Sequence, residues 1–261
     1  RDGFPRLRYL ENRKLYGVSA NFPVGDLAVG WELSYRPKDA IALSPCFNPG
    51  GKFDANFNNA TYNQSPTGAC EQWMDAEKYQ TALTGILSLT PGDYGWALNL
   101  LGADTATMMA EAVVIRYVGV SPSTKYTRTT KDGYTVVQGP SANLNFWQNN
   151  DPEAGGPITG TEGTEYSGGY TVDFNWVYDG KLIPGWQVIP GFTFTHAVFG
   201  DTPTAGPTYL HGNKALNLYV LFNQNPATWQ AGLNYAMFFG DDMRQPYRDR
   251  NFLGGFVSYN F

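Results

Sequence analysis

The sequence predicts an all-β protein, folded as an antiparallel, up-and-down transmembrane β-barrel that forms a single domain over residues 1–261. Three observations lead to this prediction: apolar and polar residues alternate with a period of two, long and short connections alternate, and aromatic residues gather at segment ends. Aromatic residues make up 15% of the chain and charged residues only 16%, a composition that excludes a disordered protein.

Strands are expected wherever the alternation is sustained. Between Tyr170 and Tyr178 every second residue is apolar or aromatic, and the residues between them are mostly polar. No helix of ordinary length is expected, although GWALNLLGAD at 95–104 fits one helical turn. The nine expected strands cover about 15–23, 27–36, 77–89, 105–118, 167–179, 185–198, 213–223, 227–239 and 251–261.

The connections between these strands alternate in length. Tight turns built on Gly, Pro and Asn (FPVGD, DGKLIPG, QNPAT) contrast with long polar connections at about 37–76 and 119–166. Membrane barrels have such short turns on the periplasmic side and long loops on the extracellular side. Single-chain bacterial barrels also have an even number of strands, so an odd number predicts the C-terminal portion of a larger barrel.

A soluble β-sandwich or lipocalin-like barrel would show the same alternation, with its apolar face turned inward. Two features favour the membrane barrel: strands of about ten to fourteen residues exceed the usual soluble length, and aromatic residues mark the strand ends. The apolar face is therefore expected to contact a lipid bilayer. The aromatic residues concerned are Tyr35, Tyr170, Tyr178, Trp186, Trp229, Phe239, Tyr259 and Phe261.

The last strand, LGGFVSYNF, resembles the C-terminal signal by which bacterial outer-membrane barrels are recognised by their assembly machinery. Leu253, Gly255, Val257, Tyr259 and Phe261 would share one face, and the chain ends on the aromatic residue. This resemblance implies the outer membrane of a Gram-negative bacterium and the assembly machinery as a partner.

Four longer stretches resemble a known family: KLYGVSANFPVGDLAVGWELSYRP, GWQVIPGFTFTHAVFGDTP, GNKALNLYVLFNQNPATWQAGLNYAMFFG and RDRNFLGGFVSYNF. They are similar to the C-terminal half of the proteobacterial outer-membrane family catalogued as domain of unknown function 1302, and the two long connections depart from it. The resemblance implies passage of hydrophobic molecules such as lipids, sterols or hydrocarbons. It also implies a periplasmic lipid carrier and an inner-membrane transporter as partners, and it identifies no site residues.

The residues expected to line the lumen are the candidates for a ligand path, because lumen residues tune selectivity. Aromatic side chains on this polar face fit an apolar ligand, but packing against a plug or an inward-folded loop explains them equally well. The alternative function is a structural or assembly barrel whose long extracellular loops bind a partner protein. The candidates are Tyr219, Phe238, Phe252, Phe256, Glu32, Arg36, Asp173, Asn175, Asn217 and Asn234.

Other chemistries have little support in the sequence. His196 and His211 lack a local serine signature, so no enzyme is expected, and no metal or cofactor site is predicted. A net charge of -5 argues against a nucleic-acid partner. Cys46 and Cys70 are expected to form a disulfide in an oxidising compartment, and its ring of roughly 25 residues would stabilise the fold by about 3 kcal/mol.

Overall fold

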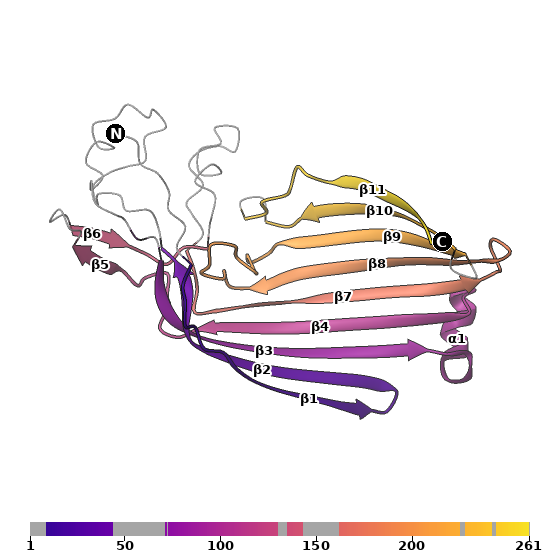
Figure 1. Ribbon diagram of the computed structural model, residues 1–261, viewed down its shortest axis with the longest axis horizontal. Helices are drawn as coiled ribbons and strands as arrows, with labels where there is room; N and C mark the ends of the chain where they lie inside the picture. Colours follow the sequence, from indigo (N-terminus) through magenta and orange to yellow (C-terminus); the bar gives the residue numbers. More distant parts are fainter. Residues whose placement is uncertain are drawn as a thin grey trace.

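The computed structural model describes residues 9–43, 71, 73–129, 135–142, 162–224, 228–241 and 244–260. One antiparallel sheet of nine strands dominates this part of the chain, and each strand pairs with the sheet strands next to it in sequence (Figure 1). The predicted all-β, up-and-down antiparallel fold is therefore confirmed. The strands are β1 (Tyr16–Val24), β2 (Leu27–Ala42), β3 (Trp73–Leu89), β4 (Thr105–Tyr117), β7 (Tyr166–Asp179), β8 (Trp186–Phe199), β9 (Lys214–Gln224), β10 (Trp229–Phe239) and β11 (Phe252–Tyr259).

Strands β2 and β3 extend further than their alternation predicts, into the expected loop 37–76. The pairing register of β2 with β3 shifts between Arg36 and Asp39 and then resumes as far as Ala42. Pro37 lies in this interval, and a proline has no N–H to donate to the ladder. The proline therefore marks a bulge within a longer strand, not its end.

A second, two-stranded sheet lies in the connection 119–166, where no strand is expected from the alternation. It pairs β5 (Tyr126–Thr129) with β6 (Thr135–Gln138) and stands apart from the main sheet (Figure 1). Strands of four residues are too short for a period-two pattern to be recognised.

The expectation of a single helical turn near 95–104 is wrong, because helix α1 (Pro91–Leu101) has 11 residues. Pro91 begins it after an extended Thr90, and Gly102 ends it with a φ of 64°, which is the usual C-terminal cap. Gly92, Gly95 and a non-helical Tyr94 obscure the helical period in the sequence. Among the described residues, no helix combines the length and the apolar character needed to cross a membrane.

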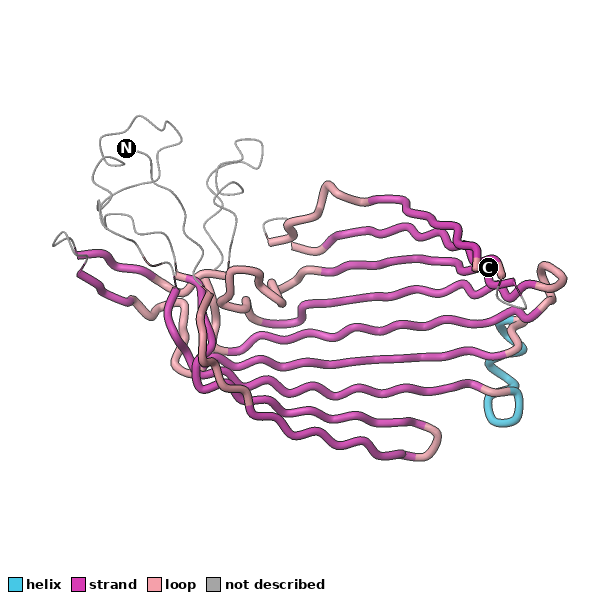
Figure 2. Tube along the Cα trace, in the orientation of Figure 1, coloured by secondary structure: helices cyan, strands magenta, loops and turns pink. Residues whose placement is uncertain are grey.

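The two ends of the sheet differ in their connections (Figure 2). At one end, here called the short-turn end, β1 joins β2 and β7 joins β8 through short turns, and α1 joins β3 to β4. At the other, the long-loop end, the connections after β2, β4, β8 and β10 are longer. The predicted alternation of connection lengths is thus present in space.

The pairing register sorts the side chains of the main sheet onto two faces, because directly paired residues project to the same side. The apolar face includes Val18, Phe22, Trp31, Leu33, Leu83, Met108, Val114, Val172, Phe192, Phe194, Leu218, Leu233, Tyr235, Leu253 and Val257. The polar face includes Ser19, Glu32, Gln80, Thr84, Glu111, Thr171, Asp173, Asn175, Thr193, Thr195, Asn217, Tyr219, Asn234, Phe238, Phe252 and Phe256.

The buried residues of the described chain gather near the two ends of the sheet. At the long-loop end, Ile41 and Leu43 pack on the polar face against Val113, Ile115 and Tyr117. Here the part of β2 beyond the bulge covers the end of β4, and the Tyr117 hydroxyl donates to Asp39 Oδ2 over 2.8 Å. At the short-turn end a second cluster lies beneath α1.

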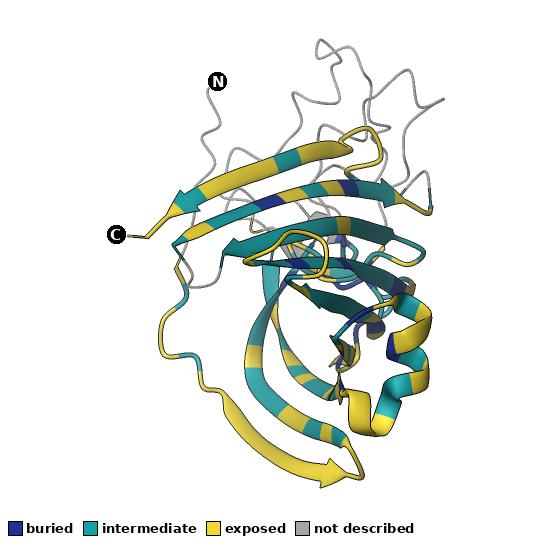
Figure 3. Ribbon diagram, turned by 90° about the vertical axis from the view of Figure 1, so that its right-hand side faces the viewer, coloured by how far each residue is buried: buried dark blue, intermediate teal, exposed yellow. Residues whose placement is uncertain are grey.

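The main sheet is strongly curved, as the view along its strands shows (Figure 3). Strands β1 and β11 form its two edges, and all nine residues of β1 are exposed. The described strands therefore form a curved wall with two open edges.

The buried cluster at the long-loop end should contribute more to stability than an exposed position on the same face nearer the short-turn end. We expect Ile115→Ala, at a residue only 1% exposed, to lower the free energy of unfolding by ~2–4 kcal/mol. Ile86→Ala, at a polar-face residue that is 41% exposed, should cost no more than ~1 kcal/mol. Urea titrations followed by tryptophan fluorescence measure both values, and equal losses would contradict this packing.

Candidate functional site on the polar face

The centre of the candidate site is the carboxylate of Asp173 on β7. Thr193 of β8 donates to its Oδ2 over 2.7 Å, and the hydroxyl of Tyr219 on β9 lies 3.1 and 3.2 Å from its two oxygens. Asn175 Nδ2 donates to Oδ1 over 3.2 Å. Three adjacent strands thus converge on one carboxylate, and all of these donors are uncharged.

A glycine allows Tyr219 to reach Asp173 across the intervening strand. Gly191 of β8 is the register partner of both Asn175 and Tyr219. A Cβ atom at this position would lie 2.5 Å from Cζ and 2.6 Å from Oη of Tyr219. The tyrosine ring therefore crosses β8 over a residue that must have no side chain.

Beside this cluster lies a hollow of about 360 Å³, which we call the polar-face hollow. The amide of Asn234 donates to Asn217 Oδ1 over 3.0 Å, and the rings of Phe238 and Phe252 lie 6.5 Å apart. The hollow therefore combines hydrogen-bonding groups with an apolar wall, and its volume is within the usual range of ligand sites. Its polar-face residues are Thr193, Thr195, Ala215, Asn217, Asn234, Ala236, Phe238 and Phe252.

Most of the predicted lumen residues lie close together on β7, β9, β10 and β11. Phe256 belongs to this region but packs over Gly232 and does not line the hollow. Glu32 and Arg36 lie apart from the others on β2, where Glu32 borders a second hollow between β1, β2 and β3. Arg36 forms an ion pair with Asp39 at 3.4 Å.

Residues that the sequence did not single out also shape the site. Gly191 admits the tyrosine ring, and the small side chains of Ala215 and Ala236 leave room for the hollow. Tyr247, from the connection after β10, packs on Phe238 with ring centroids 5.4 Å apart. Its position inside a strand is the one signal that could have identified Gly191, because a glycine there often marks a place where another group approaches the backbone closely.

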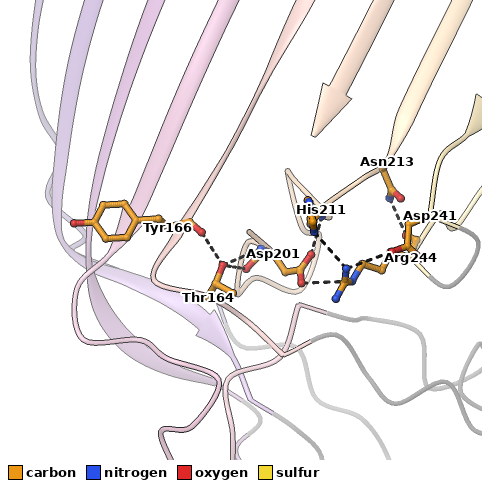
Figure 4. A network of polar contacts seen from close by, with 7 residues as sticks. All are labelled: Thr164, Tyr166, Asp201, His211, Asn213, Asp241 and Arg244. Atoms are coloured by element: carbon orange, nitrogen blue, oxygen red, sulfur yellow. Dashed lines mark hydrogen bonds and ion pairs between the residues drawn. The ribbon is translucent and has the colours of Figure 1, made fainter. Parts of the chain in front are cut away.

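A second polar cluster, the loop junction, joins three connections at the long-loop end (Figure 4). Arg244 Nε lies 3.7 Å from Oδ2 of the buried Asp201, and its Nη1 lies 3.3 Å from Asp241 Oδ2. Asp201 in turn accepts the backbone N–H of His211 over 2.8 Å. The junction consists of Thr164, Asp201, His211, Asn213, Asp241 and Arg244.

The two histidines lie in different surroundings. His196 is on the apolar face of β8, edge-on to the ring of Tyr170 at 5.6 Å. His211 belongs to the loop junction, where its Nδ1 lies 3.5 Å from Arg244 Nη1. Within the described residues, no group of three or more His, Cys, Asp or Glu is arranged to hold a metal ion.

The predicted assembly signal lies on the apolar face of β11 as far as the structure describes it. Leu253, Gly255, Val257 and Tyr259 share this face, and the Tyr259 ring packs on Trp229 with centroids 4.7 Å apart. Phe261, Cys46 and Cys70 lie outside the described residues, so the last signal position and the disulfide remain predictions.

Comparison with protein-family models identifies a match to the family described as "Protein of unknown function (DUF1302)", over residues 3–261. The chain belongs to the DUF1302 family. Searches of the curated proteins and of the solved structures found no match for this DUF1302 protein. The family description assigns no activity.

The close approach of Tyr219 to Gly191 gives a direct test of the site geometry in this DUF1302 protein. Because an added methyl group would displace the ring, we expect Gly191→Ala to cost ~1–3 kcal/mol of unfolding free energy. In a Tyr219→Ala background the same substitution should cost less, because only the close contact with Asn175 Cβ, at 2.8 Å, remains. A double-mutant cycle by urea denaturation measures this coupling, and additive losses would show that the ring does not lie over Gly191.

Proposed function

We propose that this DUF1302 protein is a β-barrel of the bacterial outer membrane through which hydrophobic small molecules or lipids pass. The apolar face contacts lipid, and the polar face lines the interior path. The observation that carries the ligand assignment is the polar-face hollow, in which an asparagine pair lies beside two phenylalanine rings.

The exposure of the apolar face supports a membrane environment. Leu83, Leu233 and Val257 are 52%, 55% and 73% exposed, although all three lie on regular, well-paired strands. Soluble monomers rarely expose so continuous an apolar surface. Such a face is expected where the solvent is hydrocarbon.

The spacing of aromatic residues supports the same environment. Trp229 and Phe239 lie at opposite ends of β10 on the apolar face, about 34 Å apart at the usual rise of a strand. With a strand tilt of about 40° this corresponds to roughly 26 Å along the membrane normal, close to the height of the apolar band of outer-membrane barrels. At the long-loop end, Tyr16, Tyr35 and Tyr79 form a stacked row across three strands.

The chemistry of the hollow indicates an amphipathic ligand. Phe238 and Phe252 offer an apolar wall, whereas the asparagine pair and the threonines offer hydrogen bonds to a hydroxyl, carbonyl or amide group. A lumen that passed only water and ions would gain nothing from exposed phenylalanine rings. A molecule with an apolar body and one polar group fits both parts of the lining.

The proposal includes the partners that the sequence implies and assigns no catalytic step to the chain. The apolar residues of β11 would be recognised by the outer-membrane assembly machinery. A periplasmic lipid carrier and an inner-membrane transporter would exchange ligand with the short-turn end, which faces the periplasm in this orientation.

Uptake of an apolar dye tests the proposed path. We expect cells of a Gram-negative host that produce the protein to take up N-phenyl-1-naphthylamine faster than cells without it. Phe252→Asp should slow this uptake on the order of tenfold, because a carboxylate beside an apolar ligand loses hydration worth more than ~1.4 kcal/mol. Initial rates of dye fluorescence, at equal amounts of protein in the membrane fraction, measure the effect.

Ser258→Asp is the matched control, because it adds the same charge to the same face of the same strand, about 20 Å from Phe252. It should leave uptake unchanged. If both variants slowed uptake equally, a negative charge anywhere on the polar face would explain the effect, and the hollow would have no special role. If neither did, the polar-face hollow would not be the path.

The loop junction favours a second function, in which the long loops bind a partner protein. Arg244 joins Asp201 and Asp241, so the described ends of two connections are held in one arrangement, as a docking surface requires. The dye experiment separates the two functions. A barrel with a sealed lumen would give no uptake above that of cells without the protein.

A further inference from the structure

Helix α1 lies across the ends of the strands and is fastened at both of its own ends (Figure 1). Near its start, the Tyr94 hydroxyl donates to Asp26 Oδ2 in the β1–β2 turn over 3.1 Å. At its end, the Tyr178 hydroxyl of β7 donates to the carbonyl of Leu101 over 2.8 Å. The helix therefore spans the short-turn end from the β1–β2 turn to β7.

The inner side of α1 packs on the apolar face of the sheet. Leu98 is 2% exposed and is buried with Leu89, Ala103 and Ala106. Around it lie Phe174, Trp176 and Tyr178 of β7, whose side chains share the apolar face. The helix thus covers part of the apolar face at the short-turn end. The proposed function places this face in contact with lipid.

The outer side of α1 exposes two apolar side chains beyond the acidic Asp93 of its first turn. Trp96 and Leu100 are 75% and 83% exposed, and a spacing of four residues places them one turn apart on the same side. This side is opposite Leu98 and points away from the sheet. Trp96 and Leu100 therefore add exposed apolar surface next to the apolar face of the sheet.

The surroundings of α1 change from apolar to charged toward the turn tips. Just beyond the helix, Lys181 forms an ion pair with Asp104 at 2.7 Å. Hydrogen bonds from Lys181 and from the backbone N–H of Asp179 hold the pKa of the Asp104 carboxyl below its usual range. This pair stays charged at neutral pH and belongs in water, so the helix lies between an aqueous and an apolar zone.

From this arrangement we propose that α1 is an interfacial helix. Trp96 and Leu100 insert at the boundary between the headgroups and the acyl chains of the phospholipid leaflet next to the short-turn end. Tryptophan is enriched at this level of a membrane because its ring is apolar and its N–H is polar. The helix has no basic residue, so its binding rests on apolar burial and needs no anionic lipid.

The inference rests on the proposed membrane location of the sheet. One experiment tests the position of the helix and the location of the sheet separately. Single cysteines are placed in a Cys46→Ser, Cys70→Ser background, labelled with the fluorophore NBD and studied in phosphatidylcholine vesicles. Spin-labelled lipids with the nitroxide at acyl carbon 5 or 12 report depth. Trp96→Cys and Leu100→Cys probe the helix, and Leu100→Cys leaves the tryptophan in place.

We expect both helix labels to be quenched at least about twofold more by the shallow nitroxide than by the deep one, as for a helix 5–10 Å into the interface. Leu83→Cys, in the middle of the apolar face, should show the opposite preference. Ser123→Cys, on an exposed turn at the long-loop end, should be quenched by neither.

If Leu83→Cys is quenched and the helix labels are not, the interfacial helix is ruled out while the barrel stands. A helix label that is shifted to the blue without quenching would indicate contact with another protein and would also overturn the inference. If no label is quenched, the membrane location of the sheet itself fails. Circular dichroism of each variant confirms that the sheet has formed.

Discussion

The cross-strand register determines which side chains of the main sheet share a face. From β1 to β11, each residue of the apolar face pairs with another residue of that face, so one surface remains apolar across every strand of the main sheet. Because side chains alternate with a period of two, a slip of one residue in any pair would exchange the two faces of a strand. The hydrogen-bond ladder and the separation of the faces are therefore fixed together.

Two of the irregular features of the main sheet occur where this constraint meets a local obstacle. At Pro37 the ladder is interrupted for a short stretch, and the continuing strand places Ile41 over the polar face of β4. At Gly191 the absence of a side chain lets the Tyr219 ring cross β8 and reach Asp173. The pairing register shifts by one residue at Pro37 and is continuous through Gly191. At both places side chains pack over the polar face and cover it.

The sequence predicts the main-sheet strands well because their alternation is long and strong, but β2 and β3 extend beyond their expected ranges to Ala42 and Trp73. It predicts α1 poorly, because Gly92 and Gly95 weaken the helical pattern and Pro91 resembles a turn signal. For the site, the pattern places Tyr219, Phe238, Phe252 and Phe256 on the polar face. It does not predict the hydrogen bond between Tyr219 and Asp173. Nor does it predict that Glu32 and Arg36 lie far from the other candidates, because both features depend on which strands are neighbours in the sheet.

We propose that the apolar face of the main sheet meets lipid and that the polar face does not. A scan of nitroxide labels along β10, from residue 230 to residue 238, tests this arrangement in phospholipid vesicles. Collisions with oxygen should dominate at Ala231, Leu233, Tyr235 and Met237, and collisions with an aqueous nickel complex should dominate at Gln230 and Asn234. Lipid contact is therefore expected to alternate with a period of two along β10, with the odd-numbered residues in lipid. Apolar-face labels that the nickel complex reaches, or that neither reagent reaches, would contradict it.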